Sequence, residues 1–377
     1  MRDVVVLGAG LHRFGRFPDK SLPDLGREAI ENALDDSGVP FKDIEVAYVG
    51  RVLAGMGAGL SVVSEMGRTG IPVINIEMAC GSSTSAFREA YLSVATGVYD
   101  TALVVGFEKM QRGLIQIADQ KSYQTVMGLA VMPASYALQA RRYMADHGAT
   151  AEMFGQVSVK SHRNGALNPY AQYQTAVTLD DVMNSRSIAD PVTLLQCSPT
   201  TDGAAAVVIC AASKAAQYKS GRLAHVAGWA TGSGKYEPTG DSAEGEADTG
   251  EIGRLVAMAW ERAGLGPEDV DVTQVHDAFA PGEIFSIEGL GLVPVGEGAQ
   301  AVWDGRTEID GDIPVNTDGG LLSRGHPIGA TGCAMVTEIV RQLTGEAGPR
   351  QVKGGDAHVG LIQNAGIGGM NILVLTS

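Results

Sequence analysis

The sequence is poor in positive charge, in aromatic side chains and in long apolar runs. Its 28 Lys and Arg residues are outnumbered by 43 Asp and Glu residues, which gives a formal net charge of −15. A nucleic-acid partner is therefore not expected, because there is no basic surface to replace the counterions of the phosphates. No apolar run approaches the ~20 residues that a membrane helix needs, so no membrane span is expected either.

Paired cysteines are also lacking. The four cysteines are scattered and form no CxxC pair, which is typical of a reduced protein with free thiols. The N-terminus has neither the apolar stretch nor the cleavage site of a signal peptide. We therefore expect a cytoplasmic protein without a metal site, in which one thiol is reactive. The cysteines are Cys80, Cys197, Cys210 and Cys333.

Glycine, in contrast, is abundant. The 377 residues include 50 glycines, while aromatic residues make up 6% of the chain. This composition suits closely packed α/β layers with many tight turns. The length allows either two domains or one duplicated unit.

Two stretches of the chain share one pattern, a helix that ends at a glycine and is followed by an apolar strand. Residues 24–49 form the first stretch and residues 251–275 the second. The glycines that end the helices, Gly38 and Gly264, are 226 residues apart, and the flanking positions keep this spacing without a gap. The match indicates an internal duplication.

A second matching pair follows in the same order. One helix begins just after Cys80 and ends near Thr96, and another begins just after His326 and ends near Thr344. The two helix ends are 248 residues apart, so the second copy carries 22 extra residues, which we place in the polar stretch around 297–312. Two related halves packed about a pseudo-twofold axis would bring Cys80 and His326 together at neighbouring helix N-termini.

We therefore predict an N-terminal half over residues 1–219 and a C-terminal half over residues 220–377. The first half contains a long stretch with no counterpart in the second. We interpret residues 110–195 as an inserted, partly helical excursion. Insertions of this size over a site usually shape substrate binding.

Cys80 is the first candidate for chemistry, within Met-Ala-Cys-Gly-Ser-Ser at 78–83. A cysteine at a helix N-terminus is expected to have its pKa lowered below ~8.5, and its backbone N–H could hold an oxyanion. A buried structural thiol is the alternative.

Two histidines are further candidates. His326 begins the string Gly-His-Pro-Ile-Gly-Ala-Thr-Gly at a helix entry, where it could act as the base of a Cys-His catalyst. His276 begins His-Asp-Ala-Phe after a strand, and it could donate a hydrogen bond to a thioester carbonyl. Loop histidines without a catalytic role are the alternative for both.

Two glycine-rich segments complete the candidates. Residues 363–369 join two strands and could point backbone N–H groups into a site, or form a structural turn. The N-terminal strand, which we expect to end at Gly8, leads into a segment that suggests a dinucleotide fingerprint. However, Arg13 occupies the place of the third glycine, which argues against a nicotinamide oxidoreductase.

The Cys-Gly-Ser-Ser, His-Asp-x-Phe, Gly-His-Pro and final glycine motifs together resemble the thiolase superfamily, and the resemblance covers the whole chain. The His-Asp-x-Phe form is similar to the sterol-carrier-type and archaeal-type branch. The resemblance implies an α/β thiolase fold: duplicated halves in a five-layered α-β-α-β-α core, with a loop domain inserted in the first half.

The same resemblance implies roles for individual residues. Cys80 would be the acylated nucleophile and His326 the base that activates it. His276 would replace the asparagine of the usual family motif and help to form the oxyanion site for an enolate. The backbone N–H groups of Cys80 and Gly368 would form a second oxyanion hole.

One departure from the family pattern is evident. Ordinary thiolases use a second cysteine as acid and base, at positions that here hold Gly366 and Ala278. Proton transfer at the substrate α-carbon would then fall to His276, His326 or water. Alternatively, the reaction needs less proton transfer, as in a decarboxylating condensation.

The resemblance implies a 3-oxoacyl-CoA thiolase, or acyl-CoA C-acyltransferase, with coenzyme A as a substrate and no permanently bound cofactor. The alternatives are a thiolase-fold lyase or decarboxylating condensing enzyme, and a non-catalytic acyl-CoA or lipid carrier. The presence of both Cys80 and His326 argues against the carrier. The resemblance also implies a homodimer or larger oligomer, with a small zinc-ribbon/OB-fold partner subunit in some relatives.

Overall fold

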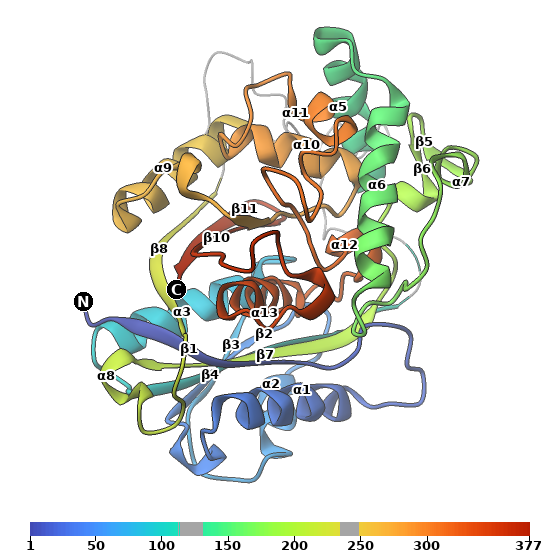
Figure 1. Ribbon diagram of the computed structural model, residues 1–377. Helices are drawn as coiled ribbons and strands as arrows, with labels where there is room; N and C mark the ends of the chain where they lie inside the picture. The colour runs from blue at the N-terminus through green and yellow to red at the C-terminus, as the bar shows by residue number, and fades with distance from the viewer. Residues whose placement is uncertain (112, 114–130, 234–248) are drawn as a thin grey trace.

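One sheet runs through the whole molecule. The computed structural model describes residues 1–111, 113, 131–233 and 249–377. In this part of the chain the strand order is β3-β2-β4-β7-β1-β8-β11-β10-β9 (Figure 1). The strands are β1 (Val4–Leu11), β2 (Val46–Gly50), β3 (Val73–Ile76), β4 (Thr101–Lys109), β7 (Asp202–Ala211), β8 (Ala224–Gly232), β9 (Val272–Gln274), β10 (Val359–Gly366) and β11 (Gly369–Thr376).

The strand order is nearly symmetric about the junction of β1 and β8. On one side β1 pairs antiparallel with β7, and β4 pairs parallel with β2. On the other side β8 pairs antiparallel with β11, and β10 pairs parallel with β9. A parallel bridge between Thr273 and Val315 occupies the place that β3 takes in the first half. This topology confirms the duplicated halves, whereas the boundary between residues 219 and 220 stays a prediction.

Helices form three layers around the two halves of the sheet (Figure 1). Helices α1 and α2 cover the outer side of the first half, α3 and α13 lie between the halves, and α9 and α10 cover the outer side of the second half. The order of layers is therefore α-β-α-β-α, as expected. These helices are α1 (Leu22–Ser37), α2 (Ala58–Ser64), α3 (Ser82–Ala95), α9 (Thr249–Ala263), α10 (Ala280–Gly289) and α13 (Thr331–Thr344).

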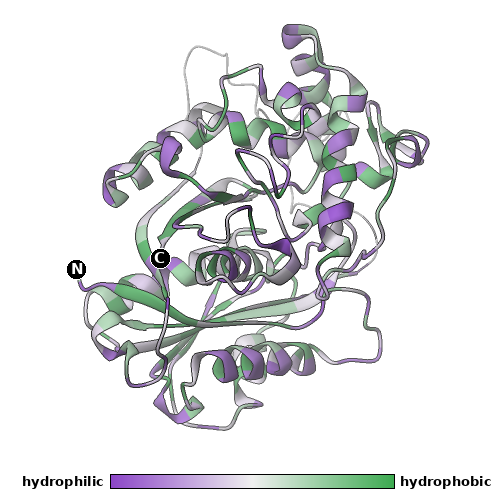
Figure 2. Cartoon of the chain, in the orientation of Figure 1, coloured by the Kyte–Doolittle hydropathy of each residue, from purple (hydrophilic) through white to green (hydrophobic). Residues whose placement is uncertain are grey.

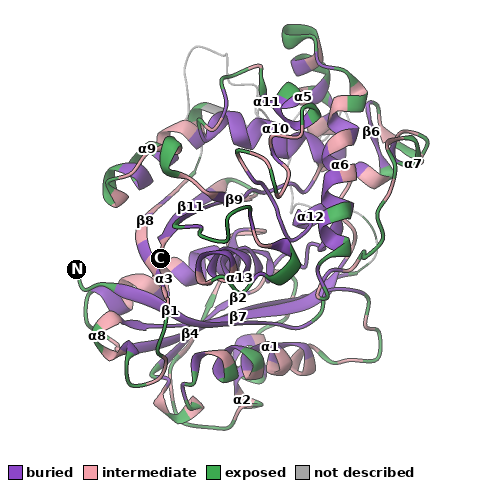
Figure 3. Cartoon of the chain, in the orientation of Figure 1, coloured by how far each residue is buried: buried purple, intermediate pink, exposed green. Residues whose placement is uncertain are grey.

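The central layer is the most buried part of the molecule (Figure 3). Every residue of α13 up to Val340 is buried, because sheet halves lie on both sides of this helix. A Cβ atom at Gly332 would lie 2.4 Å from the backbone nitrogen of Thr84, so glycine is what lets α13 approach α3 so closely. The Cys333 N–H also donates to the Ser83 hydroxyl at 3.0 Å. The two helix N-termini are side by side, as the duplication predicts.

The helices expected at the start of the stretches 24–49 and 251–275 are present as α1 and α9. Helix α1 begins with a capping box between Ser21 and Asp24, and it ends at Gly38 with a φ of 69°. The strand expected at the end of the second stretch is short, since β9 has only three residues. The polar stretch around 297–312 contains the short helix α11 (Gly298–Trp303).

The prediction that the first strand ends at Gly8 is wrong. Strand β1 continues through Gly8 and Gly10 to Leu11. A Cβ atom at Gly8 would lie 2.4 Å from the Ser37 nitrogen, and one at Gly10 would lie 2.3 Å from the Ala33 nitrogen. These glycines allow α1 to pack directly on the strand. They are therefore not part of a phosphate-binding loop.

Residues 131–195 of the inserted excursion pack on the second half of the molecule, although they belong to the first half in sequence, and residues 112 and 114–130 of the excursion lie outside the described residues. Helix α6 contacts α10, α11 and α12 (Figure 1). Hydrophobic residues are concentrated in the strands and in α13, and hydrophilic residues are frequent on the peripheral helices (Figure 2). In the part of the chain described, no helix is long and apolar enough to cross a membrane. The remaining elements are α5 (Met132–His147), α6 (Ala151–Ala166), α7 (Leu179–Met183), β5 (Ser187–Ala189), β6 (Val192–Thr193), α8 (Ala212–Ala215) and α12 (Gly320–Ser323).

Candidate active site

Three residues from distant parts of the sequence meet at the N-termini of α3 and α13. The Cys80 thiol and one ring nitrogen from each of His276 and His326 lie within 4.8 Å of one another. The two imidazole rings are 5.2 Å apart between centroids and nearly perpendicular. The duplication predicted that Cys80 and His326 would meet, His276 was the third catalytic candidate, and the structure brings all three together. The catalytic roles of the three residues stay predictions.

A strained turn presents Cys80 just ahead of α3. Ala79 has a φ of 44°, a left-handed conformation that is uncommon outside glycine and costs on the order of 1–3 kcal/mol. The turn is held by hydrogen bonds of Ser82, whose hydroxyl donates to the Ala79 carbonyl at 2.6 Å and accepts from the Met78 N–H at 2.9 Å. Such strain persists only where the surrounding structure requires the geometry.

The acidity of Cys80 differs from the sequence-based expectation. Although the residue keeps some exposed surface, burial of its thiol raises the pKa to about 12, and the Glu108 carboxylate acts in the same direction. The effect of desolvation on the thiolate thus exceeds that of the helix N-terminus. Burial also raises the pKa values of Cys197, Cys210 and Cys333 to about 12. Cys80 is therefore distinguished by its position beside two imidazoles and not by its acidity.

His326 is held in the tautomer that has a free lone pair on Nε2. Its Nδ1 lies 2.7 Å from the hydroxyl of Thr331, and that hydroxyl donates to the Pro327 carbonyl at 3.1 Å. The hydroxyl has one hydrogen, so it must accept from Nδ1–H, and the lone pair is left on Nε2. Burial, with smaller contributions from His276 and Arg324, lowers the pKa of His326 well below its usual range. The ring is therefore neutral and able to take a proton.

His276 is held in the opposite tautomer. Its Nδ1 lies 3.0 Å from the side-chain nitrogen of Asn364, while the oxygen of that amide accepts from the Thr84 hydroxyl at 2.6 Å. Nδ1 thus accepts a hydrogen bond, and the hydrogen is on Nε2. Burial, and then Arg324, lowers the pKa of His276 to about 4. At neutral pH the ring can donate a hydrogen bond but is not an imidazolium.

Sequence reasoning missed the residues that fix these tautomers. Thr331 and Asn364 lie within the glycine-rich motifs, but their spacing gives no sign of which ring nitrogen they contact. Thr201 was also missed, although its hydroxyl accepts a hydrogen bond from the backbone N–H of His326 at 3.1 Å. The string Thr-Thr-Asp-Gly at 200–203, just before a strand, was the only available signal.

Both halves of the chain match models of known protein families. Residues 4–213 match the family model for the thiolase N-terminal domain, and residues 246–375 match the model described as thiolase C-terminal domain-like.

The chain belongs to the thiolase family.

Curated relatives of this thiolase cover nearly all of it. Acetyl-CoA acetyltransferase of Methanothermobacter thermautotrophicus is 40% identical, over 97% of both chains. Sterol carrier protein 2 of Bos taurus is 35% identical, over 99% of this chain and 72% of its own length. Benzoylsuccinyl-CoA thiolase subunit BbsB of Thauera aromatica is 37% identical, over 93% and 92%. The predicted relation to the sterol-carrier-type and archaeal-type branch is confirmed.

Solved structures show the same fold. The Ltp2-ChsH2(DUF35) aldolase superposes with a TM-score of 0.87 and 26% identity, over 100% of this chain and 98% of the other. Human mitochondrial 3-ketoacyl-CoA thiolase in complex with CoA superposes with a TM-score of 0.73 and 18% identity, over 100% and 98%. The predicted thiolase fold is confirmed.

Neither of the two positions where thiolases usually carry a second cysteine holds a thiol here, and one of them has no room for a side chain. A Cβ atom at Gly366 would lie 2.2 Å from the Met78 carbonyl oxygen, so no side chain fits there. Ala278 is buried, and its carbonyl accepts from the Ser198 N–H at 2.9 Å. The neighbouring Cys197 does not replace the missing thiol, because its Sγ–H is directed to the Thr193 carbonyl, 3.3 Å away.

Gly368 lies at the exposed tip of the hairpin between β10 and β11, with a φ of 77°. The hairpin packs on the Cys80 turn through other glycines, since a Cβ at Gly369 would lie 2.2 Å from the end of the Met78 side chain. The role of the Gly368 N–H in an oxyanion hole stays a prediction.

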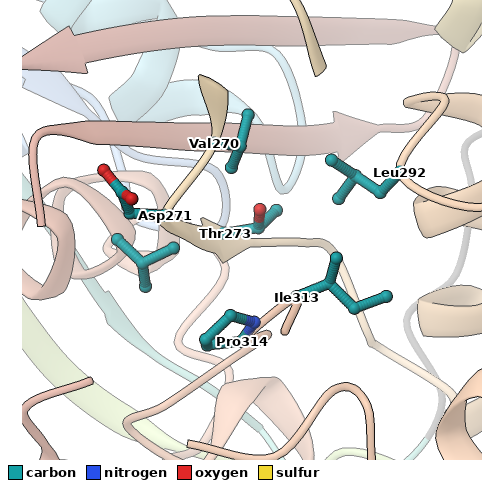
Figure 4. Close-up of a pocket in the computed structure, with 7 residues that line it drawn as sticks. Val270, Asp271, Thr273, Leu292, Ile313 and Pro314 are labelled. Carbon is teal, nitrogen blue, oxygen red and sulfur yellow. The ribbon is translucent and has the colours of Figure 1, made fainter. Parts of the chain in front are cut away.

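A small depression beside β9 is not a substrate site (Figure 4). It has no room for a water molecule, whereas ligand pockets are typically larger than ~300 Å³. None of the three clustered residues lines it. Its lining residues are Val270, Asp271, Val272, Thr273, Leu292, Ile313 and Pro314.

Proposed function

We propose that this thiolase cleaves 3-oxoacyl-CoA thioesters by forming an acyl-enzyme on Cys80 and transferring the acyl group to coenzyme A. The observation that carries the proposal is the convergence of the Cys80 thiol with two neutral imidazoles of opposite tautomer. One imidazole can take a proton and the other can give a hydrogen bond. Thiolysis through an acyl-enzyme needs a base for the attacking thiol and a hydrogen-bond donor for the oxygen of the departing enolate.

The first step joins Cys80 to the keto carbonyl. His326 Nε2 takes the thiol proton as Sγ attacks, so the thiolate and the imidazolium form together. Because burial disfavours both charged forms in the free enzyme, the ion pair forms only as the new bond is made.

The carbon–carbon bond then breaks and leaves the shorter acyl-CoA as an enolate. The Nε2–H of His276 donates to the enolate oxygen, which carries the developing negative charge. Coenzyme A takes the acyl group from Cys80 in the second half of the reaction, and the reverse sequence is a Claisen condensation. Coenzyme A is thus a substrate, and no permanently bound cofactor takes part.

A lyase on acyl-thioesters is the second candidate. It is favoured by the structural similarity to the Ltp2-ChsH2(DUF35) aldolase and by the absence of a second thiol from the Cys80 cluster, within the described residues. A non-catalytic carrier is disfavoured, because a carrier has no use for a thiol enclosed with two oriented imidazoles.

The test is acylation of Cys80 by a panel of 3-oxoacyl-CoA thioesters that includes acetoacetyl-, long-chain, sterol-side-chain and benzoylsuccinyl-CoA. We expect a mass increase on the peptide that contains Cys80, its loss in Cys80→Ser, and acylation slowed by ~100-fold in His326→Ala. Cys197→Ser is the matched control and should acylate normally. Full thiolysis by Cys80→Ala would refute the covalent mechanism, and bond cleavage without transfer to coenzyme A would favour the lyase.

A small partner subunit of zinc-ribbon/OB-fold type is part of the proposal. Its support is the similar Ltp2-ChsH2(DUF35) aldolase, in which a thiolase-fold chain is paired with a DUF35 partner. Purification of the tagged chain from its native source should yield a second, smaller protein in stoichiometric amount, and its absence would contradict this part. A cytoplasmic location is also proposed, supported by four cysteines that are all free.

A further inference from the structure

The inserted excursion brings a tyrosine to the histidine turn of the active site. Tyr136 lies on α5, and its ring centroid is 4.8 Å from that of Phe279, which follows the His-Asp-Ala sequence. Gly282 also lies beside both residues. A Cβ atom placed on Gly282 would lie 3.2 Å from the Cε1 atom of Tyr136 and 3.0 Å from the carbonyl oxygen of His276. Two independent contacts thus place the phenol against the turn that carries His276 and Ala278.

The hydroxyl of Tyr136 makes no hydrogen bond to any of the described residues. The other tyrosine on the same side of α5 differs, because the Tyr143 hydroxyl donates to the Glu288 carboxylate and accepts from the Ala299 N–H at 3.4 Å. Burial raises the pKa of Tyr136. The phenol is therefore protonated in the resting enzyme and can serve as a proton donor.

We propose that the Tyr136 hydroxyl is the proton donor and acceptor at the substrate α-carbon, in place of the second cysteine of other thiolases. The inference rests on the proposed acylation of Cys80. It assigns a catalytic task to an excursion that sequence patterns connect only with substrate binding.

The proton and electron balance is complete without a further reactant. As the carbon–carbon bond breaks, its electron pair remains on the α-carbon of the enolate, and the Tyr136 O–H gives its proton to that carbon. The resulting phenolate coexists with the His326 imidazolium, so the two charges compensate each other. Coenzyme A then gives its thiol proton to the phenolate and attacks the acyl group, and the released Cys80 thiolate regains its proton from His326.

Hydrogen exchange in acetyl-CoA tests the proposal. The enzyme is incubated with acetyl-CoA in D₂O; acylation of Cys80 is followed by protein mass spectrometry and deuterium in the methyl group by NMR. We expect Tyr136→Phe, which keeps the ring packing on Phe279, to acylate within about threefold of the wild-type rate and to exchange ~100-fold more slowly. Tyr143→Phe is the matched control and should exchange at the wild-type rate.

The outcomes separate this inference from the proposed function. Failure of the wild type to acylate Cys80 with acetyl-CoA and with every thioester of the 3-oxoacyl-CoA panel refutes the proposed function. Normal acylation with unchanged exchange in Tyr136→Phe refutes only the role of the tyrosine. Equal loss of acylation and exchange shows that Tyr136 only supports the site structurally, and normal acylation without exchange in the wild type shows that no group performs this proton transfer.

Discussion

At the scale of single residues, the main feature of the site is that burial and tautomer together decide what each imidazole can do. Both rings are neutral because burial disfavours the imidazolium form. Thr331 leaves a lone pair on His326, whereas Asn364 leaves a hydrogen on His276. Two residues of the same type are thereby suited to different tasks, and the proposed function uses His326 as a base and His276 as a hydrogen-bond donor.

This assignment predicts the effect of replacing His276. With a pKa of about 4, the ring carries no charge to lose between pH 5.5 and 8, so it contributes no inflection to the pH profile of thiolysis in that range. An asparagine amide can also donate a hydrogen bond, and His276→Asn should keep kcat/KM within about tenfold. His276→Ala should lose ~100- to 1000-fold, the scale of removing one oxyanion donor.

The measurement is kcat/KM for thiolysis from pH 5 to 8.5 for the wild type and both variants. Parallel profiles for the wild type and His276→Asn are expected. An inflection near pH 6.5 that is present in the wild type and absent from His276→Asn would mean that the imidazolium acts as an acid, contrary to the assignment.

At the scale of helices and strands, regular patterns made much of the structure predictable. Glycine-ended helices followed by apolar strands predicted α1 with β2 and α9 with β9, and a repeat spacing placed Cys80 beside His326. Two features depended on contacts that no pattern records. The pKa of Cys80 depends on how much protein surrounds its thiol, and β1 continues past Gly8 because α1 packs on its glycines.

The position of Tyr136 was beyond prediction for the same reason. Its helix lies in a part of the chain without a counterpart in the second half, and it reaches the site only because the excursion packs on α10. Contacts between segments so far apart in sequence are set by the tertiary fold. The motif residues were predictable, but the residue that approaches them from the excursion was not.

A buried ion pair joins the excursion to the second half, and its removal should be costly. The Lys160 ammonium on α6 donates to the Glu283 carboxylate on α10 and to the Val315 carbonyl at 3.0 Å. Both side chains are almost fully buried. Lys160→Met leaves the Glu283 charge without its cation and should lower the free energy of unfolding by ~3–5 kcal/mol.

Urea unfolding measures this effect, and the double variant Lys160→Met/Glu283→Leu should recover most of the loss because no buried charge is left unpaired. Arg27→Met, which removes an exposed pair with Glu31, is the control and should cost less than ~1 kcal/mol. A loss in Lys160→Met no larger than in this control would show that the ion pair does not hold the excursion in place.

At the scale of the whole molecule, one end of the sheet is left open. Strand β3 is the terminal strand of the first half and pairs only with β2 among the described strands. Ile74 on this strand is exposed, as are Met56 and Leu60 in the preceding segment. An open edge next to exposed apolar side chains favours pairing with another chain. At the opposite end of the sheet, Thr273 of β9 instead forms a parallel β-bridge with Val315.

We therefore predict that two copies of this thiolase associate through β3. The strand leads directly into the turn that carries Cys80, so association would also hold the nucleophile in place. Light scattering at micromolar concentration should give twice the mass of the 39.2 kDa chain. Ile74→Lys should shift the mass toward the monomer and lower the rate of Cys80 acylation, because a lysine on an edge strand opposes pairing.

Val295→Lys, at an exposed position in the second half, is the control and should remain dimeric. A wild-type monomer would refute the dimer, and an Ile74→Lys protein that stays dimeric would show that the interface lies elsewhere.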